Sequence, residues 1–290
     1  MKQIMKIQTF AALSIAALSF APFAHAKPTT QKLPTLASQF KKPLPFDTIP
    51  AHGGIIKITP ILHASIQIEY RGTVVLVDPI SAGSYRKVPD LVLITHSHSD
   101  HFDPAALFRF YNRSSMFIPN STEFLNAMQN SRINLFPSPT TLGYFQEVSF
   151  GDILKVQAVP AYNLVRGPKP GAKFHPKGEG NGYILTLGDK RIYIAGDTEA
   201  TPEMKALKNI DAAFLPMNLP YTMTPQEAAS AVRAFKPKVV YPYHFRYPFD
   251  KPNTNVQQFV AALKGFKTEV RVLDWYNAAP VARFVKATKQ

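Results

Sequence analysis

The chain has 290 residues, a formal net charge of +14 at pH 7 and no cysteine. Without cysteine it cannot form a disulfide framework, a thiolate metal ligand or a cysteine nucleophile, so any metal ligands must be His, Asp or Glu side chains. The positive charge favours anionic partners such as phosphate esters, lipid surfaces or nucleic acid, although many basic proteins have no such partner.

The first 26 residues have the pattern of a secretory signal peptide. Lys2 and Lys6 precede an apolar segment over residues 10–20, and Ala24-His25-Ala26 forms a small-x-small cleavage site. We therefore expect cleavage after Ala26 and a periplasmic or secreted protein; an uncleaved anchor is the alternative. No later stretch is apolar and long enough to cross a bilayer, so we expect no transmembrane segment in the mature chain.

Residues 27–52 are rich in proline and lysine and show no hydrophobic periodicity, so we expect an extended N-terminal arm. The remaining segment, residues 53–290, shows no convincing boundary and no long repeat, and it is long enough for one large domain. Any active site is therefore expected within residues 53–290.

The first half of this domain is dominated by predicted strands. Residues 55–59 are β-branched and apolar, residues 65–70 alternate, and residues 73–77 and 91–95 are nearly continuous apolar runs. Alternation is typical of a strand with one buried face, and a continuous run is typical of a strand covered on both faces. Asp103-Pro104 then predicts the start of a helix, with an N-cap and a first-turn proline.

In the second half, predicted strands alternate with predicted helices. Thr224-Pro225-Gln226-Glu227 has the capping-box pattern of a helix start. Strands are predicted at 153–159, 183–187, 191–195, 212–215, 239–241 and 269–273, and helices near 201–203, 224–235 and 255–264. This alternation predicts a layered α/β fold, in which functional side chains follow the ends of strands.

The segment from Thr95 to His101 contains three of the chain's eight histidines. His96, His98, Asp100 and His101 follow directly after the buried strand at 91–95. Imidazole nitrogens and carboxylate oxygens are the groups that bind zinc and similar divalent ions. The segment therefore predicts a metal site, and such sites commonly carry out hydrolysis.

Three further polar side chains, Asp78, Asp197 and His244, also come directly after predicted strands. Each has a simpler interpretation, because Asp78 and Asp197 can cap turns and His244 can be a buried core histidine. Loops at strand ends commonly carry function on a rigid scaffold, so we expect these three residues at the same site.

The chain resembles the metallo-β-lactamase-fold superfamily over about residues 54–275. Within it, the chain is similar to the branch of small metal-dependent hydrolases that includes sugar-phosphate lactonases, and more distantly to ribonuclease Z-like enzymes and N-acyl-phosphatidylethanolamine phospholipase D. The matching segments, in order, are Leu62-His63-Ala64-Ser65, Val77-Asp78-Pro79, Thr95 to Asp103, Ala195-Gly196-Asp197-Thr198, Tyr221 to Pro225, and Pro242-Tyr243-His244. The resemblance implies an α/β fold, a four-layer αββα sandwich with metals at one edge between the sheets.

The resemblance also implies roles for individual residues. His96 and His98 would bind a first metal ion, and Asp100, His101 and His244 a second. Asp197 would bridge both ions, and Asp78 would orient the loop that carries the ligands. The expected cofactor is Zn²⁺, one or two ions per chain, with Mn²⁺ as an alternative. Asp100 and Asp197 would handle the proton during hydrolysis.

One expected ligand is missing from the pattern. Members of the superfamily usually supply another first-metal histidine after the strand at 153–159, where this chain reads Val159-Pro-Ala-Tyr162-Asn163. Either His175 reaches the site from a loop rich in glycine and proline, or Tyr162, Asn163 or water takes the place, or only one ion binds tightly. His175 is therefore either a metal ligand or substrate contact, or an ordinary loop histidine without a role at the site.

The remaining candidates concern support and substrate. His63 is expected to have a structural or second-layer role behind the ligands rather than to bind metal. Lys177, with Lys169 and Lys173, forms either a solvated loop face or a basic lid, and Tyr221 and Asn218 are candidates to line the pocket.

The function we expect from the sequence is an exported hydrolase that uses a metal-activated hydroxide on a small or lipid-like anionic substrate, a phosphoester or phosphodiester. A lactone or amide hydrolase, such as a β-lactamase, is the alternative enzyme. A non-catalytic metal-binding or surface-binding protein is the alternative of another class. Nucleic acid is not expected as a partner, and the oligomeric state is left open.

Overall fold

The structure is a computed structural model that describes residues 46–85, 87–110, 114–131, 138–246, 254–276 and 283–284. The predicted signal peptide and all but the last seven residues of the predicted arm lie outside these ranges, so both stay predictions. Among the described residues, no helix has the length and apolar character needed to cross a membrane.

The first sheet contains seven strands in the order of the sequence, from β1 to β7, in the part of the chain that the structure describes. Strands β1 to β4 pair antiparallel, and β4 to β7 pair parallel. The strands are β1 (Asp47–Ala51), β2 (Gly54–Leu62), β3 (Ser65–Tyr70), β4 (Thr73–Val77), β5 (Leu91–Leu93), β6 (Ser115–Pro119) and β7 (Thr140–Leu142).

The second sheet contains eight strands within the described ranges, again in sequence order from β8 to β15. Strands β8 to β11 pair antiparallel, β11 to β14 pair parallel, and β15 returns antiparallel to β14. The strands are β8 (Glu147–Phe150), β9 (Leu154–Ala161), β10 (Gly180–Leu187), β11 (Lys190–Ile194), β12 (Ala212–Pro216), β13 (Val239–Tyr243), β14 (Glu269–Val272) and β15 (Arg283–Phe284).

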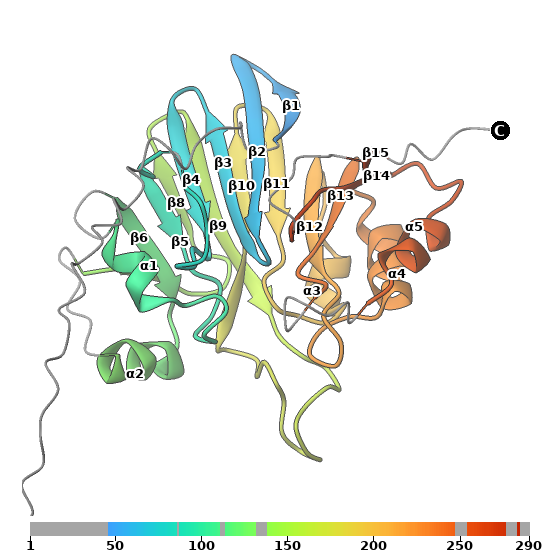
Figure 1. The fold of residues 1–290 in the computed structure, drawn as a ribbon. Coiled ribbons are helices and arrows are strands. Elements are labelled where there is room, and N and C mark those ends of the chain that lie inside the picture. Colours follow the sequence, from blue (N-terminus) through green and yellow to red (C-terminus); the bar gives the residue numbers. More distant parts are fainter. Residues whose placement is uncertain are drawn as a thin grey trace, which may run out of the picture. The chain divides into compact units, whose positions relative to one another are not determined.

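Helices cover the outer faces of the two sheets, as Figure 1 shows. Helices α1 (Pro104–Phe108) and α2 (Thr122–Asn130) lie on the first sheet, and α3 (Pro202–Lys205), α4 (Pro225–Phe235) and α5 (Val256–Ala262) lie on the second. Three apolar cores separate the layers: one between the sheets and one beneath each set of helices. The four-layer αββα sandwich expected from the resemblance is confirmed.

The helix starts follow the expected local chemistry. Asp103 caps α1 by accepting hydrogen bonds from the backbone of Ala105 and Ala106, with Pro104 in the first turn. In α4 the capping box is complete, because Thr224 and Glu227 each accept a hydrogen bond from the backbone of the other. Both caps satisfy N–H groups that have no partner inside the helix.

The predicted arm ends earlier than expected, because residues 47–51 form β1. This strand pairs antiparallel with β2, and its Asp47 is buried and accepts a hydrogen bond from the hydroxyl of Tyr241 at 2.8 Å. Proline had argued against a strand here, but β1 is an edge strand, where the missing N–H of Pro50 interrupts little pairing. The domain therefore begins before residue 53.

Parallel strands bring their C-terminal ends to one edge of each sheet. Asp78 follows β4 and the His96 segment follows β5, whereas Asp197 follows β11 and His244 follows β13. The two edges meet, because the backbone N–H of His244 donates to the carbonyl of His63, in the turn between β2 and β3. All of the predicted ligands are thereby collected between the two sheets.

Candidate metal centre

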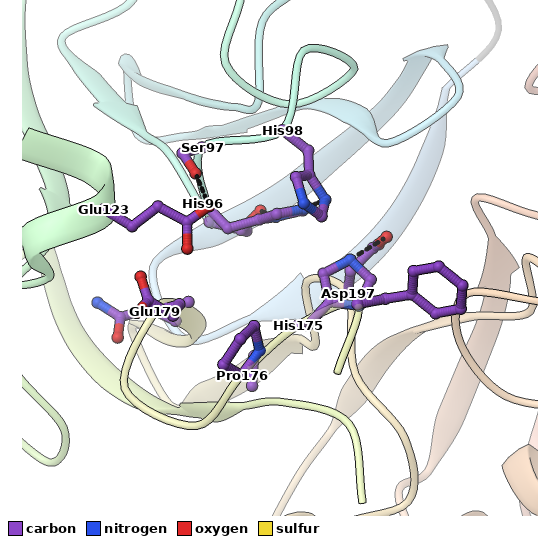
Figure 2. A pocket seen from close by; sticks show the side chains of 13 residues that line it. His96, Ser97, His98, Glu123, His175, Pro176, Glu179 and Asp197 are labelled. Carbon is purple, nitrogen blue, oxygen red and sulfur yellow. Dashed lines mark hydrogen bonds and ion pairs between the residues drawn. The ribbon is translucent and has the colours of Figure 1, made fainter. Parts of the chain in front are cut away.

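The first group of potential metal ligands contains His96, His98 and His175. One ring nitrogen from each residue lies within 4.8 Å of the other two. The closest pair is His96 Nε2 and His98 Nδ1, at 3.1 Å, and the ring of His175 lies 5.0 and 4.9 Å from the two other rings, centroid to centroid. Among the alternatives for the missing ligand, the structure therefore brings His175 into the cluster (Figure 2).

The second group of potential ligands contains His63, Asp100 and His244. Asp100 Oδ2 lies 3.0 Å from His63 Nε2, 3.4 Å from His244 Nε2 and 3.8 Å from His101 Nε2. The two nitrogens His101 Nε2 and His244 Nε2 are 2.8 Å apart. These separations match the edges of a coordination polyhedron with metal–ligand bonds of about 2.0–2.2 Å.

Asp197 joins the two groups. Its Oδ2 lies 3.3 Å from His175 Nε2, and its Oδ1 lies 3.3 Å from His244 Nε2 and 3.4 Å from His101 Nε2. One carboxylate oxygen therefore faces each group, which is the arrangement of a bridging carboxylate. His96, His101 and Asp197 also form a ligand group of their own.

The atoms at this centre fit a bound cation. Asp197 Oδ1 is buried and has no hydrogen-bond partner among the described residues. His101 donates from Nδ1 to Asp78, so in the neutral ring its Nε2 carries a lone pair, and this lone pair faces carboxylate oxygens. A buried acceptor that faces other acceptors is costly unless a positive charge lies between them, which is either a proton on His101 or a metal cation.

Asp78 orients His101 from behind. Its carboxylate is fully buried and accepts hydrogen bonds from the Thr95 backbone N–H and hydroxyl, both at 2.7 Å, and from His101 Nδ1 at 2.8 Å. Asp78 adopts a left-handed backbone conformation, with φ of 45°, which the surrounding contacts must hold in place. By holding Nδ1 of His101, Asp78 fixes the orientation of the ring and leaves Nε2 as the nitrogen that can bind metal.

His63 supports Asp100 through a defined tautomer. The hydroxyl oxygen of Tyr276 accepts hydrogen bonds from the backbone N–H groups of Phe245 and Arg246 and lies 3.1 Å from His63 Nδ1. On the other side of the ring, the ionised carboxylate of Asp100 can only accept a hydrogen bond. His63 Nε2 then carries the hydrogen and donates it to Asp100 Oδ2. This geometry fits the supporting role expected for His63.

The charge states suit metal binding. Burial lowers the pKa of His96 well below its usual value, with neighbouring His101 and His98 adding to the effect. For Asp100 and Asp197 burial alone would raise the pKa, but the surrounding imidazoles hold both values well below the usual range. Ionised carboxylates and neutral imidazoles are the forms that coordinate metal ions.

His101 responds to the same charges in the opposite direction. Burial lowers its pKa, but Asp197, Asp100 and Asp78 together outweigh burial and raise the pKa to about 10. Three carboxylates, of which Asp78 and Asp197 are buried and Asp100 is half-buried, are thus stabilised by a nearby positive charge, which a divalent cation also provides. The ligand roles of the individual residues remain predictions.

Tyr162 and Asn163, the other candidates for the missing ligand, point to different partners. The Tyr162 hydroxyl donates to Glu203 Oε2 at 2.8 Å. Asn163 Oδ1 accepts hydrogen bonds from both the backbone N–H and the ring Nδ1 of His175, at 2.8 and 2.6 Å. The polar groups of both side chains thus have protein partners, Glu203 for Tyr162 and His175 for Asn163.

The lysine and tyrosine predicted to contact substrate also have internal partners. Lys177 Nζ donates to Glu203 at 2.8 Å and lies over the ring of Tyr162, 4.7 Å from its centroid. Tyr221 packs edge-on against Phe174, with ring centroids 4.9 Å apart. Lys177 and Tyr221 are absent from the described lining of the pocket, so their substrate roles stay predictions.

A pocket opens beside the first ligand group, and Figure 2 shows its lining. His96, His98, His175 and Asp197 form one part of it, and Phe174 and Pro176 supply apolar surface. Glu123, from α2, and Glu179 also line it. Burial and the nearby Glu123 raise the pKa of Glu179. The described lining contains no lysine or arginine.

Sequence reasoning missed Glu123, Glu179 and Phe174. Glu123 lies in the first turn of α2, where an acidic residue commonly serves the helix itself. Glu179 and Phe174 lie in the loop that follows Asn163. No local pattern marks any of the three, because only the tertiary structure brings them to the metal centre.

Fold and site together define a metal-dependent hydrolase of the metallo-β-lactamase superfamily. The family model described as the beta-lactamase superfamily domain matches residues 57–244, and the chain belongs to this family. It is 30% identical over 209 residues to a UPF0173 metal-dependent hydrolase of Listeria monocytogenes, covering 68% of this chain and 88% of that one. A UPF0173 metal-dependent hydrolase of Ligilactobacillus salivarius is 32% identical over 211 residues, covering 69% and 90%.

Solved structures agree with this family. A protein from Parabacteroides distasonis, assigned as a metal-dependent hydrolase, is 36% identical with a TM-score of 0.68, over 79% of this chain and 98% of that one. The metallo-beta-lactamase fold protein YhfI from Bacillus subtilis is 14% identical, with a TM-score of 0.56 over 81% and 92%, and supports the fold alone.

Proposed function

We propose that this chain is an exported hydrolase with two zinc ions, and that its substrate is an uncharged carbonyl compound, a lactone or an amide. His96, His98 and His175 would hold the first ion, Asp100, His101 and His244 the second, and Asp197 would face both. The observation that carries this proposal is the position of the Asp197 carboxylate, whose two oxygens face different groups of imidazoles.

When bound, zinc lowers the pKa of coordinated water toward neutrality and supplies hydroxide as the nucleophile. The residues of the chain prepare this step. Asp100 and Asp197 are ionised at neutral pH, so either carboxylate can accept the proton of the nucleophile. His63 and Asp78 hold the two sides of the second group in position.

The pocket lining supports an uncharged substrate. Glu123 and Glu179 add negative charge beside the first ligand group, and the lining contains no basic side chain among the described residues to offset it. Bound zinc would attract any anion, but these two carboxylates make the pocket less favourable for a phosphate group than for an uncharged substrate, and Phe174 and Pro176 offer apolar contact. Lys177, which had favoured an anionic substrate, is paired with Glu203.

A phosphoester or phosphodiester is the second candidate substrate, and the net charge of +14 favours it. The net positive charge attracts anions to the protein surface over a longer range than that over which the two pocket glutamates repel them.

A non-catalytic binding protein is the candidate of another class. The comparison with metal-dependent hydrolases of 30–36% identity supports the enzyme instead.

The test compares three substrate classes on the protein loaded with Zn²⁺ or Mn²⁺: a lactone panel, nitrocefin as a β-lactam amide, and bis-p-nitrophenyl phosphate. We expect turnover of a lactone or amide that disappears in His96→Ala, with two ions per chain by metal analysis. Turnover of the phosphodiester alone would overturn the substrate assignment. Bound metal with no turnover of any substrate would favour the binding protein.

Export is proposed on the basis of residues 1–26, and it is tested separately. Expression of the full chain in a Gram-negative host, followed by cell fractionation and N-terminal sequencing, should give a periplasmic protein that begins at Lys27. An intact N-terminus at Met1 in the cytosolic fraction would contradict this expectation.

A further inference from the structure

We propose that Asn163 is the positioning residue that makes His175 a metal ligand, and that Glu199 fixes Asn163 for this purpose. The inference rests on the proposed function, because it assumes an ion at His96, His98 and His175. It concerns a hydrogen-bond chain behind that ion, which runs from Glu199 through Asn163 to the imidazole of His175.

The first step is the contact between Asn163 and His175. Both side chains are buried, with 3% and 5% of their surface exposed. Asn163 Oδ1 accepts hydrogen bonds from the backbone N–H and from the ring Nδ1 of His175, and the Asn163 backbone N–H donates to the His175 carbonyl at 2.8 Å. Three hydrogen bonds therefore join two residues that stand twelve positions apart.

The orientation of the Asn163 amide follows from its partners. On one side the backbone N–H of His175 can only donate, so the oxygen of the amide must face it. On the other side the carbonyl of Tyr221, at 2.9 Å, and Glu199 Oε1, at 3.2 Å, can only accept from an N–H group, so the nitrogen must face them. The reversed amide would break all of these contacts.

This orientation selects the tautomer of His175. Because Asn163 Oδ1 is an acceptor, the hydrogen of the neutral imidazole is on Nδ1, and the lone pair is on Nε2. Nε2 faces the centre, where it lies 3.3 Å from Asp197 Oδ2. Asn163 thus does for His175 what Asp78 does for His101: it holds one nitrogen and leaves the other free for a metal ion.

Glu199 holds the loop that joins the two residues. Glu199 is 3% exposed, and its carboxylate accepts hydrogen bonds from the backbone N–H groups of residues 164, 165 and 166, at 2.8–3.0 Å. Arg166 adds an ion pair at 3.2 Å. The loop then closes tightly, since a Cβ at Gly167 would lie 1.8 Å from the Ala172 carbonyl oxygen. His175 is consequently delivered to the site by a rigid loop.

The test uses Asn163→Leu, which keeps the approximate size of the side chain and removes the amide that links Glu199 to His175. Its matched control is Tyr144→Phe, which removes the hydroxyl that accepts from Gly178 N in the same loop and leaves His175 untouched. His175→Ala serves as the reference for a lost ligand. Zinc affinity is measured by competition with a chelator, and the coordination of Co²⁺ by its visible spectrum.

We expect Asn163→Leu to bind one of the two ions about 10–100-fold more weakly, as replacement of a supporting residue commonly does. Its Co²⁺ spectrum should shift toward that of His175→Ala, whereas Tyr144→Phe should match the wild type. Wild-type affinity and spectrum in Asn163→Leu would overturn the inference. A wild-type chain that binds no metal would instead overturn the proposed function, so the two failures are distinguishable.

A measurement on the unmodified chain covers the case in which Asn163→Leu does not fold. Long-range ¹H–¹⁵N spectra of the histidine rings, with His175 assigned by comparison with His175→Gln, report which nitrogen carries the hydrogen. We expect the hydrogen to be on Nδ1, and we expect zinc addition to shift the ¹⁵N resonance of Nε2. Hydrogen on Nε2, or metal at Nδ1, would refute the positioning role of Asn163.

Discussion

Replacing Asp78 with asparagine should weaken binding of the second ion with little change of shape. Asparagine can still accept from the Thr95 N–H through its oxygen, but its NH₂ group then faces His101 Nδ1 in place of the carboxylate oxygen found there now. His101 would accept that hydrogen bond at Nδ1, and its own hydrogen would move to Nε2, the nitrogen that faces the metal centre.

To bind metal, the His101 ring of Asp78→Asn must return its hydrogen to Nδ1, where two donors then oppose each other in a buried site. An unsatisfied buried donor costs about 1–3 kcal/mol, and 1.4 kcal/mol corresponds to about tenfold in affinity. We therefore expect a loss of about 10–100-fold in zinc affinity, measured by competition with a chromogenic chelator. Asp90→Asn is the control, since the Asp90 carboxylate accepts a hydrogen bond from Val74 N and the residue is exposed. Equal affinity in Asp78→Asn and wild type would refute the tautomer argument.

Three further results are expected. Removing metal with a chelator should lower Tm, because an ion present at about a thousand times its Kd adds about 4 kcal/mol to stability; an unchanged Tm would contradict a tightly held ion. Gly196→Ala should destabilise the chain by about 1–3 kcal/mol in calorimetry, because φ is 64° and a Cβ would meet the Asn181 carbonyl at 2.9 Å, whereas Gly72→Ala, with open space around it, should lose less. Glu199→Gln should lower Tm most near pH 7. Burial opposes ionisation of Glu199, but hydrogen bonds from the loop hold its pKa below 4.5, so its contribution is present above that pH and is lost as the pH falls through the lowered value. A Tm difference that is independent of pH between 7 and 3 would contradict this reasoning.

Much of the centre was predictable because its signals are local in the sequence. His96, His98, Asp100 and His101 follow one strand within six positions, so no long-range contact was needed to group them. Asp197 and His244 were predictable from a rule of the fold, since the ends of parallel strands meet at one edge.

His175 and Lys177 lie only two positions apart, and the sequence could not separate their roles. His175 reaches the centre because Asn163 and Glu199 hold its loop, and these contacts depend on the packed second sheet. Lys177 is neutralised by Glu203, a residue of α3 that no pattern near Lys177 reveals. Charge alone therefore suggested an anionic substrate, whereas the uncharged substrate that we propose takes account of these tertiary contacts.

The 2.8 Å approach of His101 to His244 joins segments that are 143 positions apart in the chain. Each residue follows a strand of a different sheet, so an ion between them would tie the two halves of the sandwich together at their open edge. In a chain without cysteine, such an ion would serve as a cross-link between the sheets, but it would stabilise the fold by binding the native arrangement of ligands, whereas a disulfide restricts the unfolded chain. Unlike a disulfide, this cross-link would respond to the supply of metal rather than to the redox state, so metal starvation would loosen the fold and stop catalysis together.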